Sequence, residues 1–304
     1  MAAKSLDGRC VYYGILGPLE VRDEGGDVPV SGKLQRALLA LLLVHGNEVV
    51  STDRILDEVW GDDQPGGGVR TLRFHISKLR SALGDGARLV TRAPGYTLEL
   101  EPADLDATQF ETLAKVGKRE LADDPARAAK TLREGLELWR GPALADFEYD
   151  DFARTETQRL TELRLAALGD RIEADLALGG QADLIGELQE VVEAHPYHER
   201  FWGQLMVALY RAGRQADALA AYRKARSLLG EELGIEPSPT LRDLEERILL
   251  QVPELEPPAA GSAPIELRSF TTDFVGRSEE LATVGDLLDR SRLVTLSGPG
   301  GIGK

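Results

Sequence analysis

The chain contains almost no cysteine, since Cys10 is the single one among 304 residues. One cysteine excludes a framework of disulfides within the chain and fits a reducing compartment. The sequence also lacks any run of about 18 apolar residues, so we expect no transmembrane helix and no membrane partner. Its start, MAAKSLDGRC, lacks the apolar segment of a secretory signal. These absences predict a cytoplasmic protein.

Residues that carry catalysis or bind metals are also sparse. The four histidines give no convincing metal spacing, and the nearest pair, His195 and His198, is expected on the surface beside a helix start. No nucleophile lies in a G-x-S-x-G context, and no carboxylate pair or metal cluster stands out. We therefore expect no enzyme activity, no metal and no cofactor for this chain.

Acidic residues outnumber basic ones, and the net charge of −15 at first argues against nucleic acid. The charge is not evenly distributed along the chain. Between residues 70 and 92 six cations face one acid, Asp85, which gives this segment a charge of six minus one, or +5. A compact basic patch on an acidic protein is typical of a DNA-binding domain.

The first hundred residues predict strands, three helices and a terminal hairpin. Apolar and turn residues place two strands around Gly17-Pro18, with a further hairpin or loop after them. Helices are expected at 33–47, at 53–60 with Ser51 or Thr52 as N-cap, and at 69–84. Two short β runs, 88–93 and 96–100, surround Pro94-Gly95. This order predicts a winged helix-turn-helix domain, with the last hairpin as the wing.

The third of these helices separates into an apolar face and a polar face. At 100° per residue, Ile76, Leu79 and Leu83 fall within about 40° of Leu72 and form a buried stripe. The opposite face carries cations, one aromatic ring and hydroxyls, a mixture suited to a major groove. Its residues are Arg70, Arg73, Phe74, Ser77, Lys78 and Ser81. A solvated, charged helix face is the alternative interpretation.

Each residue of this basic segment can be given an expected role. An arginine can bind O6 and N7 of one guanine, and Phe74 can pack on a thymine methyl group. Thr71 and Arg80 flank the face and are better placed for phosphates, which fix register without reading sequence. Arg92, on the predicted wing, is placed to enter a neighbouring minor groove.

From 104 to 250 the sequence is almost entirely helical in pattern and contains a repeat. LGGQAD recurs as AGRQAD, with Gly179 and Gly213 separated by 34 residues, the tetratricopeptide (TPR) period. In the second copy Trp202, Ala218 and Tyr222 fall at positions that pack helix pairs rather than perform chemistry. The acidic run 146–151 is expected to be a solvated loop, with a partner contact as the alternative.

The last fifty residues predict a linker followed by a phosphate-binding signature. Residues 253–272 are rich in Pro and Ala and lack periodicity. The chain then ends in GPGGIGK, which satisfies the Walker A pattern G-x-x-x-x-G-K and also G-x-G-x-x-G. Its nucleotide-binding residues would be Gly298, Gly300, Gly301, Gly303 and Lys304. Because the Mg²⁺-binding Ser/Thr and the Walker B acid are absent, we expect no nucleotide binding by this chain.

Several segments resemble one family of regulators. LGPLEV, KLQRALLALLL, VSTDRILDEVWG, TLRFHISKLRSALG and TRAPGYTLEL are similar to the OmpR/PhoB-type DNA-binding domain of the SARP (Streptomyces antibiotic regulatory protein) and AfsR regulators. LWRGPALADFEYDDFARTE, HPYHERFWGQLMVALYRAGRQADALAAYRKAR and ELGIEPSPTLRDLEERIL resemble the bacterial transcriptional activation domain that follows it there. GPGGIGK, with FVGR at 274–277, looks like the start of the NTPase module of the AfsR-type members. Phe74 departs from the small aliphatic residue common at its position.

The resemblance implies a mainly α fold with a small β component. A winged-helix DNA-binding domain (1–103) would precede a TPR-like all-α activation domain (104–252), a linker (253–272) and the truncated start of an NTPase module (273–304). It implies a transcriptional activator that binds promoter direct repeats as a homodimer and recruits RNA polymerase, including its sigma factor, at antibiotic or other secondary-metabolite genes. By the same resemblance the recognition helix is 70–80, and Arg92 is the wing contact.

Two rival functions remain open. An ATP-dependent signal-transducing regulator would need ATP and Mg²⁺ in a longer parent protein that supplies the rest of the NTPase module. A protein-interaction scaffold would use the winged domain to bind protein instead of DNA, and the basic segment 70–92 argues against it.

Overall fold

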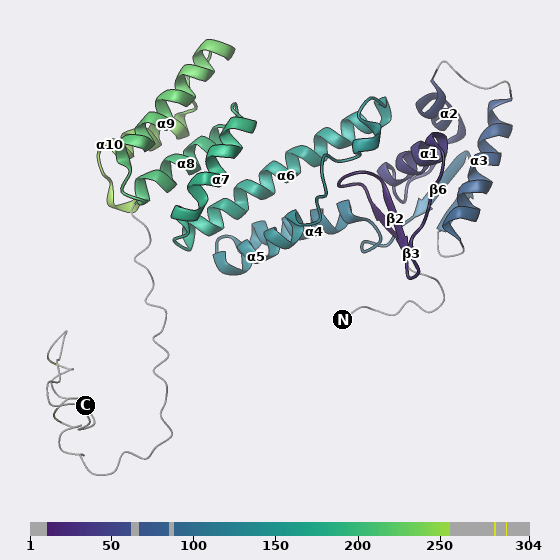
Figure 1. Ribbon diagram of the computed structural model, residues 1–304, viewed down its shortest axis with the longest axis horizontal. Helices are drawn as coiled ribbons and strands as arrows, with labels where there is room; N and C mark the ends of the chain where they lie inside the picture. The colour runs from purple at the N-terminus through teal and green to yellow at the C-terminus, as the bar shows by residue number, and fades with distance from the viewer. Residues whose placement is uncertain (1–10, 62–66, 85–87, 256–282, 284–289, 291–304) are drawn as a thin grey trace. The chain divides into compact units, whose positions relative to one another are not determined.

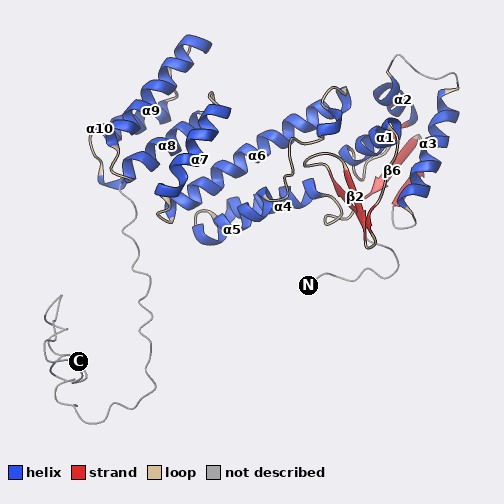
Figure 2. Cartoon of the chain, viewed as in Figure 1, coloured by secondary structure: helices blue, strands red, loops and turns tan. Residues whose placement is uncertain are grey.

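The computed structural model describes residues 11–61, 67–84, 88–255, 283 and 290. In these residues helices predominate, and the strands lie in the first hundred residues (Figure 2). The strands are Tyr12–Gly14 (β1), Glu20–Asp23 (β2), Gly26–Asp27 (β3), Val50–Ser51 (β4), Arg88–Arg92 (β5) and Gly95–Glu99 (β6). The helices are Lys33–Val44 (α1), Thr52–Trp60 (α2), Gly68–Leu83 (α3), Asp106–Glu120 (α4), Pro125–Leu136 (α5), Asp151–Ala177 (α6), Gln181–Ala194 (α7), Glu199–Arg211 (α8), Gln215–Leu228 (α9) and Pro239–Leu249 (α10), with short helical turns at Ala145–Phe147 (η1), Leu229–Leu233 (η2) and Pro253–Leu255 (η3).

Two small antiparallel sheets frame the first three helices. In the first sheet β1, β2 and β3 follow one another as neighbours, and Tyr13 lies opposite Val21. In the second sheet the order is β4-β6-β5, so the last hairpin pairs with the short strand that precedes α2. Strand β6 of this sheet lies beside α1 (Figure 1). The mainly α fold with small sheets, the winged-helix order and the hairpin after α3 are confirmed.

Helix α3 packs as its periodicity predicts. Leu72 and Leu79 are fully buried, and Ile76 and Leu83 are at most 4% exposed. Of the two proposed N-caps for α2, Ser51 is the one observed, because its Oγ accepts the Arg54 N–H at 3.2 Å. The apolar stripe therefore fixes which face of α3 points outward.

The wing is attached closely to the start of α2. Gly95 lies opposite Ser51, and a Cβ at residue 95 would sit 1.8 Å from the Val50 carbonyl oxygen, so this approach needs glycine. The Thr52 N–H and Oγ1 both donate to the Pro94 carbonyl oxygen, at 3.2 and 3.1 Å. The wing is thus positioned by α2 as well as by its own hairpin.

The helical region contains the predicted repeat. Helices α7 and α9 each have 14 residues, and their first residues, Gln181 and Gln215, are 34 positions apart. Gly179 and Gly213 precede them with φ of 87° and 75°, the left-handed region that glycine adopts readily. The residues assigned to helix-pair packing are buried, among them Trp202, whose Nε1 donates to the Pro196 carbonyl oxygen at 2.8 Å.

The hydrophobic core does not divide at residue 103. One continuous cluster runs from Val11 through the winged-helix residues to Phe110 in α4, Phe147 in η1 and Leu160 in α6. A second cluster begins in α6 at Leu165 and extends through α7 to α10. The long helix α6 therefore contributes to both cores, which overlap near its middle, where Leu165 belongs to the second cluster and Ala167 to the first.

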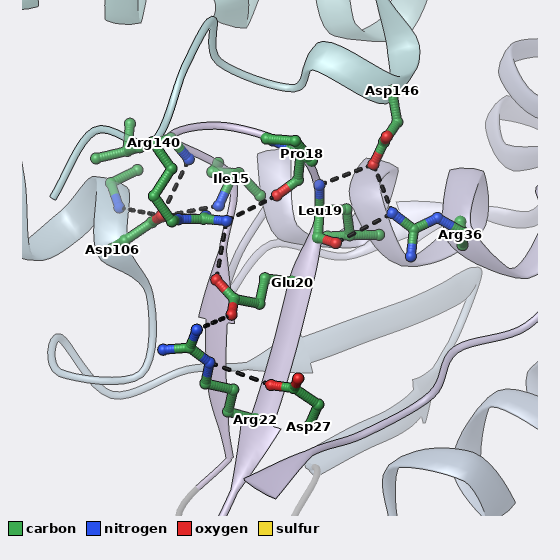
Figure 3. A network of polar contacts seen from close by, with 12 residues as sticks. Ile15, Pro18, Leu19, Glu20, Arg22, Asp27, Arg36, Asp106, Arg140 and Asp146 are labelled. Carbon is green, nitrogen blue, oxygen red and sulfur yellow. Dashed lines mark hydrogen bonds and ion pairs between the residues drawn. The ribbon is translucent and has the colours of Figure 1, made fainter.

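Polar contacts reinforce the shared core, and we call Asp106, Arg140, Asp146 and Arg36 the clasp (Figure 3). The fully buried Asp106 carboxylate accepts the N–H groups of Ile15 and Leu16, from the loop between β1 and β2, at 2.8 and 2.9 Å. Arg140 binds Asp106 at 3.1 Å and also donates to the Pro18 carbonyl oxygen at 3.0 Å. Burial raises the pKa of the Asp106 carboxyl, although these donors act in the opposite direction.

The acidic run was expected to be solvated, and for Asp146 that prediction is wrong. Its carboxylate accepts the Leu19 N–H at 2.8 Å and pairs with Arg36 Nη2 at 2.5 Å. Both partners belong to the winged-helix region, so Asp146 holds the two halves together. The run nevertheless reaches the surface at Tyr149, which is 90% exposed.

The described ranges contain neither a membrane-spanning helix nor a metal site. No helix in them combines the length and apolar character needed to cross a membrane. In the same residues no group of three or more His, Cys, Asp or Glu side chains is arranged to hold a metal ion.

Candidate nucleic-acid interface

The outward face of α3 carries most of the residues predicted to contact DNA. Arg70, Arg73, Phe74, Ser77 and Lys78 are exposed along it. Within the described part of the chain, no carboxylate lies within ion-pair distance of Arg70, Arg73 or Lys78. Thr71 and Arg80 are half-buried at the margin. The helix therefore presents open positive charge that can meet base edges and phosphates.

Phe74 and Lys78 form a pair on this face. The Phe74 side chain is 55% exposed, and the Lys78 Nζ lies 4.7 Å from the centre of its ring. The ring also meets His75 edge-on at 5.6 Å, and His75 in turn packs on Trp60 of α2 at 6.0 Å. A row of rings thus supports the exposed phenyl group from α2. Neither Trp60 nor His75 was predicted to support the site.

Arg80 has a structural role that the sequence did not indicate. Its Nε donates to the Leu89 carbonyl oxygen, and its Nη2 donates to Thr91 Oγ1, both at 2.9 Å. These bonds join the last turn of α3 to strand β5 of the wing. The predicted phosphate contact of Arg80 stays a prediction, and it would have to coexist with these two bonds.

Both arginines of the wing strand are paired with carboxylates. Arg92 Nη2 lies 2.7 Å from Glu99 Oε1, and Arg88 Nη1 lies 3.0 Å from Glu101 Oε1. The Arg92 side chain is nevertheless 59% exposed. Sequence reasoning placed Arg92 on the wing but did not identify Glu99, because that pairing depends on strand register. The wing cations thus differ from the open cations of α3.

The nucleotide-binding prediction cannot be placed on this structure. Gly298, Gly300, Gly301, Gly303 and Lys304 all lie outside the described residues.

Comparisons with known proteins agree with the fold. Residues 28–98 match the family described as "Transcriptional regulatory protein, C terminal", and residues 105–249 match the "Bacterial transcriptional activator domain". Both matched segments are transcription-factor domains. A winged helix with an open basic face, followed by such a helical domain, defines a DNA-binding transcriptional regulator.

Two relatives of similar length identify the family. The chain is 39% identical to the transcriptional regulator RedD of Streptomyces coelicolor, over 83% of this chain and 74% of RedD. It is 37% identical to the regulatory protein DnrI of Streptomyces peucetius, over 83% of this chain and 98% of DnrI. The chain belongs to the SARP family of transcriptional regulators.

Two further likenesses extend the comparison. The regulatory protein AfsR of Streptomyces coelicolor is 34% identical over 99% of this chain, but the chain covers only 32% of the length of AfsR. The structure of Mycobacterium tuberculosis EmbR in complex with a low-affinity phosphopeptide superimposes with a TM-score of 0.77 at 34% identity. It covers 83% of this chain and 67% of that one. The predicted winged-helix and all-α order thus recurs in a solved relative.

Proposed function

We propose that this protein is a transcriptional activator that binds direct repeats in promoter DNA through α3 and the wing. The open, cationic face of α3 carries the proposal, because it combines Arg73 and Lys78 with the exposed ring of Phe74. Arg70, Arg73 and Lys78 would bind guanine edges, and Phe74 would pack on a thymine methyl group. Ser77 and Thr71 would add contacts to bases and phosphates.

The wing and the margin of the helix complete the proposed contact. Arg92 would enter the minor groove beside the major groove that α3 occupies. Arg80 would contact a phosphate while it holds β5. Because several of these contacts neutralise phosphates, the affinity should fall steeply as salt rises.

We also propose that two copies bind adjacent repeats and recruit RNA polymerase, including its sigma factor, through the helical half. The match of 105–249 to an activator domain and the TPR-like pairing of α6 to α9 support this, since such folds commonly bind proteins. We further propose that the protein acts in the cytoplasm at secondary-metabolite genes, as its membership of the SARP family implies.

Selection from a pool of random duplex DNA tests the proposal, because such a pool requires no choice of operator sequence. The protein should enrich duplexes that carry two copies of one motif in the same orientation. On the selected duplex, Arg73→Ala combined with Lys78→Ala should lower the affinity at least about 30-fold in a gel shift, because each base contact contributes about 1–3 kcal/mol.

A matched control uses cations of the helical half. Lys115→Ala combined with Lys130→Ala removes two surface charges that pair only within that half, and should leave the affinity nearly unchanged. Unchanged binding by the α3 double variant would overturn the assignment of the site. No enrichment of any motif would overturn sequence-specific DNA binding itself.

We propose nucleotide binding only for a longer protein that supplies the Mg²⁺-binding Ser/Thr and the Walker B acid. In such a protein Gly298, Gly300, Gly301, Gly303 and Lys304 would bind the phosphates of ATP. The likeness to AfsR, which covers 99% of this chain but a third of AfsR, supports that extension. Tight binding of ATP by residues 1–304 alone would contradict it.

A further inference from the structure

The Arg92–Glu99 ion pair spans most of the wing hairpin. In the register of the two strands, Arg92 lies opposite Gly95, beside the turn, whereas Glu99 lies opposite Arg88 at the far end. Four positions therefore separate the two residues along the ladder, a distance of about 13 Å at the usual strand rise. An Nη2–Oε1 distance of 2.7 Å closes that separation only when both side chains extend toward each other along the hairpin.

The guanidinium of Arg92 thus lies back along the wing and away from the turn at Ala93 and Pro94. A groove of DNA that receives the tip of the wing would meet this turn first. Arg92 must leave Glu99 and swing forward before its charge can reach such a groove. The open cations of α3 need no such exchange in the described structure.

We propose that Glu99 is a positioning residue that holds Arg92 retracted and so limits how readily the wing engages DNA. The inference rests on the proposed function, in which Arg92 enters the minor groove. On DNA the carboxylate competes with phosphate and base-edge oxygens for the same guanidinium, and Arg92 transfers from Glu99 to the DNA. Recognition then occurs in order, first by α3 and afterwards by the wing.

Strand β5 carries a second arginine that serves as a control for Arg92. Arg88 and Glu101 form a similar exposed ion pair at 3.0 Å, but Arg88 lies at the end of β5 that is remote from the turn. The release of Arg88 should therefore add little to groove contact. Removing the charge of Glu101 therefore measures how much DNA affinity changes when the wing merely loses one negative charge. Any larger change on removing the charge of Glu99 is the effect of releasing Arg92.

The test measures the affinity of the full chain for the selected duplex by fluorescence anisotropy, with Glu99→Gln and Glu101→Gln as matched variants. We expect Glu99→Gln to bind about two- to five-fold more tightly at low salt, the range of an exposed ion pair. Glu101→Gln should change the affinity by less than half of that factor. Because Glu99 is at the surface and Gln has its shape, both variants should keep the thermal unfolding midpoint of the unaltered protein.

A double-mutant cycle assigns the gain to Arg92. In an Arg92→Ala background, Glu99→Gln should give no gain, because no guanidinium remains to be released. An unchanged or weaker affinity for Glu99→Gln would overturn the proposal, as would an equal gain for Glu101→Gln or a gain that persists without Arg92. Absence of any selected duplex would instead count against the proposed function.

Discussion

His75 lies on α3 between the exposed reading face and the apolar stripe, and it packs between Trp60 and Phe74. Its Nδ1 is buried without a hydrogen-bond partner among the described residues. Burial, and then the positive charge of Lys78, lower the pKa of His75 below its ordinary value of 6.5. Protonation of the ring is therefore less favourable in the folded protein than in the unfolded chain.

The sign of this shift predicts acid sensitivity. Below pH 6.5 the unfolded chain takes up a proton at His75 more readily than the folded chain does, so stability is lost as the pH falls through that value. Thermal unfolding at pH values about one unit above and below it should show a lower midpoint on the acid side. His75→Gln should reduce that difference, whereas an equal difference in the variant would exclude His75 as its source.

At the same scale, the sequence predicted which residues of α3 are buried, because a helical period assigns each position to a face. It did not predict the partners of the charged side chains. Arg80 bonds to Leu89 and Thr91, and Arg92 pairs with Glu99, only because the hairpin adopts one register and packs on one end of α3. The residue types alone are compatible with many other partners for these arginines.

At the scale of elements, Gly95 is the point where three strands and a helix meet. Strand β6 carries it between β5 and β4, and β4 provides Ser51, the N-cap of α2. The order of strands and helices was predictable from turn residues and apolar periodicity. The close approach of β4 to Gly95 was not, since it joins segments more than forty residues apart.

Gly95→Ala should weaken this junction. The new Cβ would overlap the Val50 carbonyl oxygen, so β4 must move away from β6, and overpacking of this kind costs about 1–3 kcal/mol. Denaturant unfolding should report that loss. Gly141→Ala is the matched control, because nothing lies within 4 Å of the added Cβ. Equal stabilities for the two variants would contradict the close approach.

At the scale of the whole molecule, the described winged-helix and helical residues behave as one packed unit. The repeat in the helical half was predictable because its period is visible in the chain. The clasp was not, because Asp106 binds amides some ninety positions earlier and Asp146 binds Leu19 at a separation of 127. Acidic residues look alike in a sequence whether they face water or a neighbouring domain.

Arg140→Met should loosen the two halves without unfolding either. It removes the donors to Asp106 and Pro18 and leaves a buried carboxylate with fewer partners, at a cost of about 1–3 kcal/mol. Hydrogen exchange at the amides of Ile15, Leu16 and Leu19 should accelerate. Arg133→Met, which breaks a pair with Asp175 inside the helical half, should leave these amides protected. Unaltered exchange in Arg140→Met would show that Arg140 is not needed to hold the two halves together.

The continuous core also bears on how DNA specificities can be exchanged between relatives. A chimera joined near residue 103 would set Phe110 and Leu160 of one protein against the foreign winged helix of another. The two cores instead overlap inside α6, where Leu160 and Ala167 belong to the first and Leu165 belongs to the second. The transferable module is therefore the winged helix together with α4, α5 and the part of α6 that packs against them, which extends to Ala174. A graft that respects this boundary should transfer the winged helix together with the helices that pack against it.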